Sequence, residues 1–114
     1  MWKIFSVKTI YRTSAFGKPE IVNEKYQNKF DLIEERIITI KARSFDEAII
    51  KGEKEAIQYA EGEYFNPYGE QVRQRYIGSI DIFELFDNFP ANIEVFSSTF
   101  IVKKTHSIMN LLMN

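Results

Sequence analysis

The sequence predicts an α+β fold, in which an antiparallel sheet of about four strands packs against one main helix as a two-layer sandwich. Only one segment, residues 44–62, repeats apolar residues at helical spacing. Four other segments are rich in β-branched and aromatic residues, as strands are. The predicted order is therefore strand-strand-helix-strand-strand. With 114 residues, of which 45% are hydrophobic, the chain fits a single domain, 1–114.

The first predicted strand, Trp2–Arg12, carries apolar residues at both parities, so we expect both of its faces to be covered in part. The segment that follows, Thr13–Asn28, contains Gly17 and Pro19 and is predicted to be a loop. A loop of this length is uncommon in a small domain. It is either a binding loop or the mobile tip of a hairpin.

The second predicted strand, Phe30–Arg43, contains a conflict in its pattern. Glu34 and Arg36 have the parity that is apolar at both ends of the strand. A regular strand would therefore direct a carboxylate and a guanidinium toward the core. A bulge near these residues would instead turn them outward. The sequence leaves both alternatives open.

The predicted helix, Ser44–Gly62, begins with a capping box. Ser44 can accept a hydrogen bond from the amide of Glu47, whose carboxylate can reach back to the amide of Ser44. Gly62 is placed to end the helix in the left-handed conformation. Glycine and alanine residues make much of the apolar stripe flat and small, which suits close packing on a sheet. Its members are Phe45, Ala48, Ile49, Gly52, Ala56 and Ala60.

The rest of the chain is predicted to form a turn, two strands and a short C-terminal helical tail. The turn lies in Glu63–Gly69, where Asn66-Pro67-Tyr68-Gly69 is a turn signal. The strands are Gln71–Phe86, which runs into a bend, and Ile93–Lys104. The tail, Thr105–Asn114, has apolar residues at helical spacing.

Composition excludes several classes of function. With 15 basic and 16 acidic side chains, the net charge of −1 argues against bulk nucleic-acid binding. The chain has no cysteine and one histidine, so thiolate chemistry and multi-histidine metal sites are excluded. We expect no metal and no cofactor. No apolar run is long enough for a transmembrane helix and no signal peptide is evident, so we expect no membrane association and a cytoplasmic protein.

Several segments, in this order, resemble a known family. Residues 34–37 and 40–48 resemble its strand-then-helix core, and Tyr64, Asn66 and residues 69–72 resemble its turn. Residues 75–78, with Ile82 and Leu85, and residues 94–97 resemble its later strands. The chain looks like a member of the bacterial domain-of-unknown-function family 4288 over roughly residues 30–100, with a tryptophan near the N-terminus. The long loop after the first strand and the C-terminal tail depart from the family pattern. The resemblance implies a fold and a bacterial source, and it assigns no catalytic residues.

Two sets of residues are candidates for a site. The first is a polar cluster on three predicted strands, made of Glu34, Glu35, Arg36, Arg73, Arg75 and Glu94. It can be a cross-strand ladder of ion pairs, or it can bind a charged ligand or act as acid and base. The second is a set of aromatic residues around the loop and the turn, which can contact a partner protein: Phe16, Tyr64, Phe65 and Tyr68.

The leading functional hypothesis is a non-enzymatic, protein-binding module, most concretely a bacterial immunity-type protein that neutralises a partner toxin encoded by a neighbouring gene. Small size, aromatic richness and a near-neutral charge favour it. The alternative is a ligand-binding or catalytic domain that uses the Glu/Arg cluster. A third option is a homodimer that covers the open sheet face.

Overall fold

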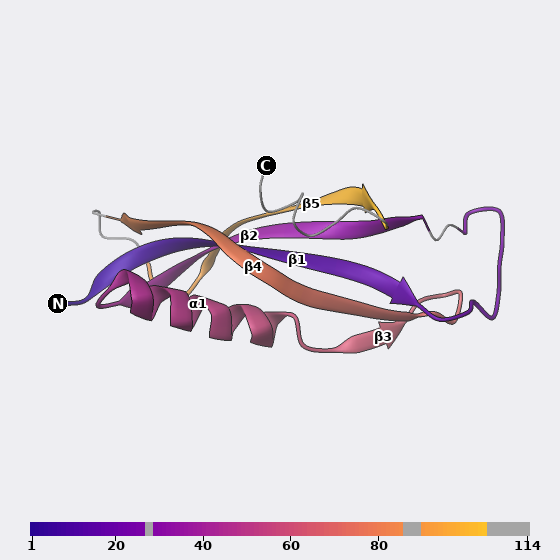
Figure 1. The fold of residues 1–114 in the computed structure, drawn as a ribbon, viewed down its shortest axis with the longest axis horizontal. Coiled ribbons are helices and arrows are strands. Elements are labelled where there is room, and N and C mark those ends of the chain that lie inside the picture. The colour runs from indigo at the N-terminus through magenta and orange to yellow at the C-terminus, as the bar shows by residue number, and fades with distance from the viewer. Residues whose placement is uncertain (27–28, 86–89, 105–114) are drawn as a thin grey trace.

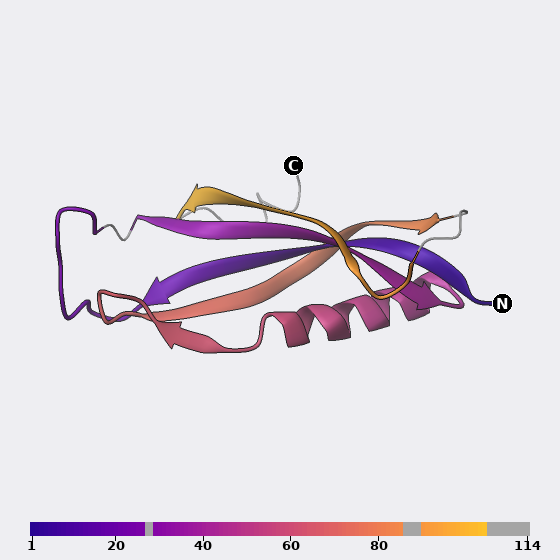
Figure 2. The same ribbon diagram turned by 180° about the vertical axis from the view of Figure 1, so that it is seen from behind.

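The computed structural model describes residues 1–26, 29–85 and 90–104. They form one antiparallel sheet of order β3-β4-β1-β2-β5 with a helix on one face (Figures 1 and 2). The elements are β1 (Lys3–Phe16), β2 (Phe30–Ala42), α1 (Phe45–Tyr59), β3 (Glu63–Phe65), β4 (Gln71–Leu85) and β5 (Glu94–Lys103).

The predicted four-stranded sandwich is wrong. The sheet has five strands, because β3 forms within the segment expected to be a turn and pairs with β4. The helix is also too short to make a full second layer. A 15-residue helix is about 22 Å long, whereas a 15-residue strand such as β4 is about 50 Å long. Figure 1 shows α1 beside one end of the sheet, with β3 beyond it. The predicted C-terminal helical tail lies outside the described residues.

The register of β2 shows which alternative holds for Glu34 and Arg36, a bulge that turns them outward or a regular strand that directs them inward. From Ala42 opposite Lys3 to Leu32 opposite Thr13, β2 pairs with β1 without a register shift. There is therefore no bulge between these strands near Arg36, which lies opposite Thr9 and faces α1. Arg36 is only 5% exposed, so it is a buried charge that the fold must satisfy.

The N-cap of the helix is the predicted residue. Ser44 is the N-cap, and its hydroxyl accepts from the amide of Glu47 at 3.1 Å. The carboxylate of Glu47 forms ion pairs with Arg43 and Lys51. The helix ends earlier than Gly62, which has a φ of +110°, a left-handed conformation that favours glycine.

Small residues bring α1 close to the sheet. Ala48, Gly52 and Ala56 are its buried residues, as the predicted stripe requires, although Phe45 is half exposed. A Cβ added at Gly52 would lie 3.3 Å from Cγ1 of Val7, so the helix and β1 are in close contact there. The core cluster beneath the helix combines β1, β2 and α1: Phe5, Val7, Ile38, Ile40, Ala42 and Ala48.

Two further differences concern β1 and β4. β1 extends to Phe16, so the loop before β2 is shorter than predicted. β4 is irregular, with register shifts against β1 and a positive φ of 54° at Asp81, inside the strand. α1, the one helix among the described residues, is not long and apolar enough to cross a membrane.

Candidate functional site

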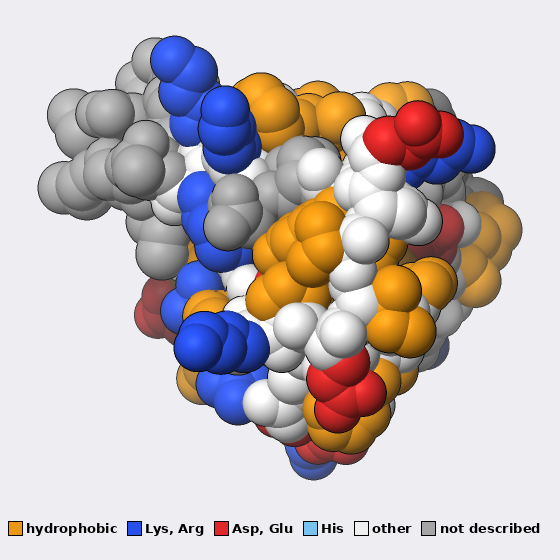
Figure 3. Space-filling model, turned by 90° about the vertical axis from the view of Figure 1, so that its right-hand side faces the viewer, with side chains coloured by type: hydrophobic (Ala, Val, Ile, Leu, Met, Phe, Trp, Pro, Cys, Tyr) orange, Lys and Arg blue, Asp and Glu red, His pale blue; other side chains and the backbone are white. Residues whose placement is uncertain are grey.

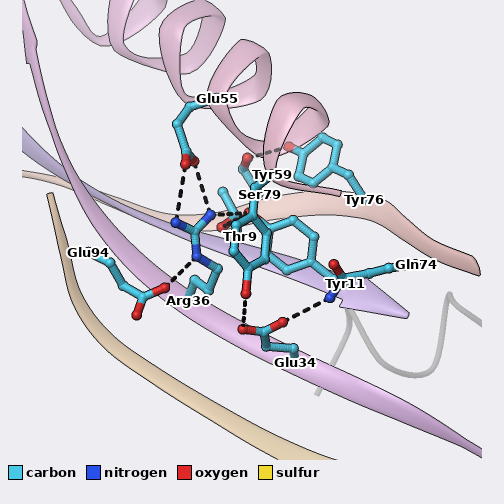
Figure 4. Close-up of polar contacts among 10 residues, drawn as sticks. All are labelled: Thr9, Tyr11, Glu34, Arg36, Glu55, Tyr59, Gln74, Tyr76, Ser79 and Glu94. Atoms are coloured by element: carbon cyan, nitrogen blue, oxygen red, sulfur yellow. Dashed lines mark hydrogen bonds and ion pairs between the residues drawn. The ribbon is translucent and has the colours of Figure 1, made fainter. Parts of the chain in front are cut away.

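The first candidate site is a network of polar residues around Arg36. The Nε of Arg36 donates to Glu94 at 2.6 Å, and its two Nη atoms donate to the two oxygens of Glu55 at 3.1 Å each. One Nη also donates to the hydroxyl of Tyr11 at 2.9 Å. Four of the five guanidinium N–H donors are therefore used, from β5, α1 and β1 (Figure 4).

These contacts stabilise the charged form of Arg36. Burial by itself would lower its pKa, but the hydrogen bonds with Glu55, Glu94 and Tyr11 outweigh burial and raise the pKa. The side chains of Glu55 and Glu94 are 38% and 40% exposed, so water reaches the carboxylates from outside. The network is thus a buried cation held between two half-exposed anions.

Aromatic rings enclose the cation. The guanidinium carbon lies 3.5 Å from the ring centroid of Tyr59 and 5.7 Å from that of Tyr11. The two rings meet edge to face at 5.0 Å. Burial, followed by the hydrogen bond to Glu34, raises the pKa of Tyr59 to about 12. Burial also raises the pKa of Tyr11. Both phenols are therefore neutral hydrogen-bonding groups near neutral pH.

Glu34 extends the network along the helix-facing side of the sheet. It accepts from the hydroxyl of Tyr59 at 2.7 Å and from Nε2 of Gln74 at 2.8 Å. Figure 4 shows it on the far side of the Tyr59 ring from Glu55. Glu34 therefore interacts with Arg36 through Tyr59, and no direct ion pair joins the two residues.

The structure brings together only half of the polar cluster predicted from the sequence. Glu34, Arg36 and Glu94 belong to one network. Glu35, Arg73 and Arg75 lie opposite Ile10, Ser14 and Arg12 of β1, on the other face of the sheet.

Three of the residues closest to Arg36 were not predicted from the sequence. They are Tyr11, Glu55 and Tyr59. Tyr59 carried one usable signal, because it follows Gly52 and Ala56 at the spacing of the buried helix stripe. Glu55 and Tyr11 carried none, since their roles depend on which strand lies beneath the helix.

A groove adjoins this network. Its volume is about 670 Å³, and it lies between one side of α1, β2 and residues 92–94. Ile38 and Ile40 provide buried apolar lining, and Arg36, Glu55 and Glu94 contribute charges. Trp2 also lines the groove, with Lys51 Nζ 4.7 Å from its ring centroid.

A second buried charge, Asp31, lies on the opposite face and was also missed from the sequence. Its carboxylate accepts from Arg12 at 2.8 Å, Ser14 at 2.8 Å and Lys104 at 2.9 Å. Burial by itself would raise the pKa of Asp31, but these hydrogen bonds and the charge of Lys104 lower it. The cluster ties β1 and β2 to the end of β5.

The aromatic residues predicted to contact a partner gather at the end of the sheet beyond α1. Phe65 and Phe16 lie on either side of Gln71 in one row across β3, β4 and β1. Tyr64, Phe65 and Phe16 are 62%, 73% and 39% exposed. Figure 3 shows hydrophobic side chains on this end of the molecule, with Lys and Arg along one side.

Tyr68 has a different role from the other three. Its ring stacks on Tyr26 at 5.0 Å, and its backbone carbonyl accepts from the amides of Glu20 and Ile21. It therefore fixes the loop between β1 and β2 against the turn between β3 and β4.

Among the described residues, no group of three or more acidic, histidine or cysteine side chains is placed to hold a metal ion. His106, the only histidine, lies outside the described residues.

Comparison with known proteins identifies a family and nothing closer. A family described as "Domain of unknown function (DUF4288)" matches residues 4–97, which confirms the resemblance noted in the sequence and extends it through β1. No curated protein and no solved structure matches the chain.

Proposed function

The chain belongs to the DUF4288 family, and we propose that it is a non-enzymatic protein-binding module that uses the end of the sheet beyond α1. The observation that carries this proposal is the exposure of Phe16 on β1 and of Tyr64 and Phe65 on β3, on either side of β4 at one end of the sheet. Phe16 and Phe65 share one face of the sheet, and Tyr64 lies on the other. We call these three residues the aromatic end. Exposed aromatic side chains that gather in this way are typical of the centre of an interface.

The surroundings of the aromatic end also favour an interface. Arg73 lies with its guanidinium 5.4 Å from the ring centroid of Phe16 and pairs with Glu63 at 2.9 Å. Arginine beside aromatic rings is a frequent combination at interface hot spots. The adjoining loop adds Ile21 and Val22, which are 63% and 65% exposed.

This surface is held in place before any partner arrives. The carbonyl of Tyr68 accepts from Glu20 at 2.7 Å, and the hydroxyl of Tyr26 donates to Glu70 at 3.0 Å. Gly69, with a φ of +84°, approaches Glu20 so closely that a Cβ there would lie 2.9 Å from its Cγ. A preformed surface loses less conformational entropy on binding.

The most concrete form of the proposal is an immunity-type protein of a bacterium, acting in the cytoplasm. It would bind a toxin encoded by a neighbouring gene and neutralise it by covering a functional surface of the toxin. In this mechanism the aromatic end enters an apolar depression on the toxin, and Lys and Arg along one side face acidic groups around it.

The proposal is tested by expressing the product of the adjacent gene alone and together with this chain. Growth arrest by the product alone and rescue by this chain are expected. The double variant Tyr64→Ser/Phe65→Ser should lose rescue and weaken binding of the purified pair by at least a hundredfold, since two exposed anchors are removed.

The matched control is Phe83→Ser, which removes a 60% exposed phenylalanine from the other end of β4 and should keep full rescue. Thermal unfolding must show that all variants fold. Absence of toxicity would overturn the immunity-type form. Equal binding by the double variant and the control would overturn the role of the aromatic end.

The groove beside Arg36 favours a second candidate, a small-ligand-binding domain. Its apolar lining and nearby cations suit an aromatic acid. Trp2 is the only tryptophan and lines the groove, so its fluorescence reports on binding. Lys54 lines the groove and Lys25 does not. Titration with benzoate and larger aromatic carboxylates should give a saturable change in fluorescence that Lys54→Glu abolishes and Lys25→Glu retains. No change with any of these compounds would count against this candidate.

A further inference from the structure

The outer edge of β5 is open in the described part of the chain. Among the strands that the structure describes, β5 is the last of the sheet and pairs with β2 alone (Figures 1 and 2). Between Glu94 and Lys103 it contains no charge and no proline. Natural edge strands usually carry such residues, because they prevent pairing with another chain.

Within residues 1–26, 29–85 and 90–104, no strand pairs with the outward-facing backbone groups of β5. The amide of Lys104 donates to the carbonyl of Lys29 at 2.7 Å, so this residue directs its backbone toward β2. In an antiparallel pair the direction alternates along the strand. Ser97, Thr99 and Ile101 therefore direct their N–H and C=O groups outward, away from β2.

The side chains of β5 have a pattern that reads nearly the same in both directions. Around Ser98 the order is Val95-Phe96-Ser97, then Ser98, then Thr99-Phe100-Ile101. Small polar residues flank the centre on both sides, then phenylalanines, then aliphatic residues. Such a strand is complementary to an antiparallel copy of itself.

We propose that β5 pairs with β5 of a second copy of this chain, with Ser98 opposite Ser98 on the two-fold axis, to form one continuous ten-stranded sheet. Phe96 then lies opposite Phe100 of the partner subunit, twice, and Val95 lies opposite the partner's Ile101. Phe96, Ser98 and Phe100 share one face, so four phenylalanine rings surround the axis there.

The other registers fit less well. Residues that lie opposite each other in an antiparallel pair point to the same face of the sheet. The two-fold axis therefore passes through a residue, and alternative registers move it by whole residues. A centre at Ser97 places Phe96 opposite Ser98, and a centre at Thr99 places Phe100 opposite Ser98. Both Phe96 and Phe100 are substantially exposed, at 50% and 40%, and only the centre at Ser98 covers each with a phenylalanine.

A bulge limits the length of the pairing. Ile37 lies opposite Phe96 and Ile38 lies opposite Glu94, so Val95 is the extra residue of β5. The regular part of the new ladder is therefore short, and we expect a reversible dimer rather than an obligate one.

Sedimentation equilibrium of the full chain tests the proposal. The wild-type chain should show a concentration-dependent monomer–dimer equilibrium. Thr99→Pro removes an N–H that points outward and leaves the ladder to β2 intact, so it should fold but self-associate at least tenfold more weakly. Phe83→Ser, a matched change of an exposed phenylalanine on β4, should leave the dimer unchanged.

A monomer at every concentration would overturn the proposal, as would open-ended assembly or a dimer that survives Thr99→Pro. The Tyr64→Ser/Phe65→Ser variant should keep the dimer, so failure of the partner-binding proposal and failure of this one are distinguishable.

The register is tested by cross-linking, because the chain has no cysteine of its own. In the proposed dimer the two copies of residue 98 form a non-hydrogen-bonded pair with Cα atoms about 4.5 Å apart, within the range of a disulfide. Ser98→Cys should therefore form a covalent dimer under mild oxidation. Val102→Cys, which lies opposite the partner's Glu94, should not. Equal cross-linking of both variants would overturn the register.

Discussion

The guanidinium of Arg36 lies against the ring of Tyr59, with 3.5 Å between the guanidinium carbon and the ring centroid. The charge that β2 directs toward the helix is thus covered by the last turn of α1 and neutralised from both sides by Glu55 and Glu94. This relationship explains how a buried position on the helix-facing side of the sheet accepts an arginine.

Removal of the central cation should destabilise the protein more than removal of either anion. Arg36→Met loses two ion pairs and the contact with Tyr59, and we expect the free energy of unfolding to fall by about 3 kcal/mol. Glu55→Gln should cost about 1 kcal/mol or less, because its carboxylate is partly solvated. Urea denaturation measures both losses.

The control is Arg75→Met, which changes an exposed arginine on the other face and should change the free energy of unfolding by less than about 0.5 kcal/mol. Equal losses for Arg36 and Glu55 would contradict this account.

The ring of Tyr59 should matter more than its hydroxyl. Tyr59→Phe keeps the ring over Arg36 and loses the hydrogen bond to Glu34, at a cost of about 0.5–1 kcal/mol. Tyr59→Leu loses the cation–π contact as well and should cost about 1 kcal/mol more. If the two variants unfold at the same denaturant concentration, the ring makes no special contribution.

The raised pKa of Tyr59 predicts a loss of stability in alkali. The folded-state pKa of Tyr59 is about 12 and the ordinary value is about 10. The contribution of this phenol to the free energy of unfolding is therefore complete below pH 10 and is lost as the pH rises toward 12. Tyr59→Phe should therefore lose less stability than the wild type over this interval. Ultraviolet titration should show one fewer phenol ionising above the ordinary range. Parallel pH profiles for the two proteins would contradict the assignment.

Asp31 predicts acid sensitivity on the other face. Its pKa is lowered in the folded state, so its contribution is present above the ordinary value of about 3.9 and is lost as the pH falls through the folded-state pKa. Asp31→Asn should cost about 3 kcal/mol at neutral pH, because it removes the carboxylate that faces Arg12 and Lys104. Its stability should also depend less on pH below 4. Glu61→Gln, at an exposed position, should reproduce the wild-type profile.

The close approach at Gly52 predicts an unusual response to alanine. Alanine normally stabilises a helix by about 1 kcal/mol relative to glycine. Here its Cβ would press on the fully buried Val7, and we expect a net loss of about 1 kcal/mol. In the background Val7→Ala the same change should become neutral or stabilising, which a double-mutant cycle measures. Stabilisation by Gly52→Ala in the wild-type background would show that the helix can move.

Features encoded within one segment could be predicted from the sequence. The N-cap at Ser44 and the small-residue stripe of α1 depend on neighbours along the chain, and the structure has both. β3 could not be predicted, because a three-residue strand exists only through its pairing with Gln71–Arg73.

The candidate site shows the same division. Glu34 and Arg36 are charged residues at an otherwise apolar parity of β2, which the sequence shows. Only the continuous β1–β2 register shows that they face inward. Glu55 and Tyr11 come from other elements, so nothing near Arg36 in the sequence identified them. Asp31 was missed because Arg12 and Ser14 approach it only across two paired strands.

The position of β1 has a consequence for how the protein is made. β1 is the first strand to be synthesised and the middle strand of the finished sheet, between β4 and β2. On the ribosome it can pair with β2 early, but its other edge stays open until α1, β3 and β4 have emerged. Closing such long-range pairs slows folding and exposes strand edges meanwhile. The length of the segment between β2 and β4 should therefore control the rate of folding more than the stability of the folded protein.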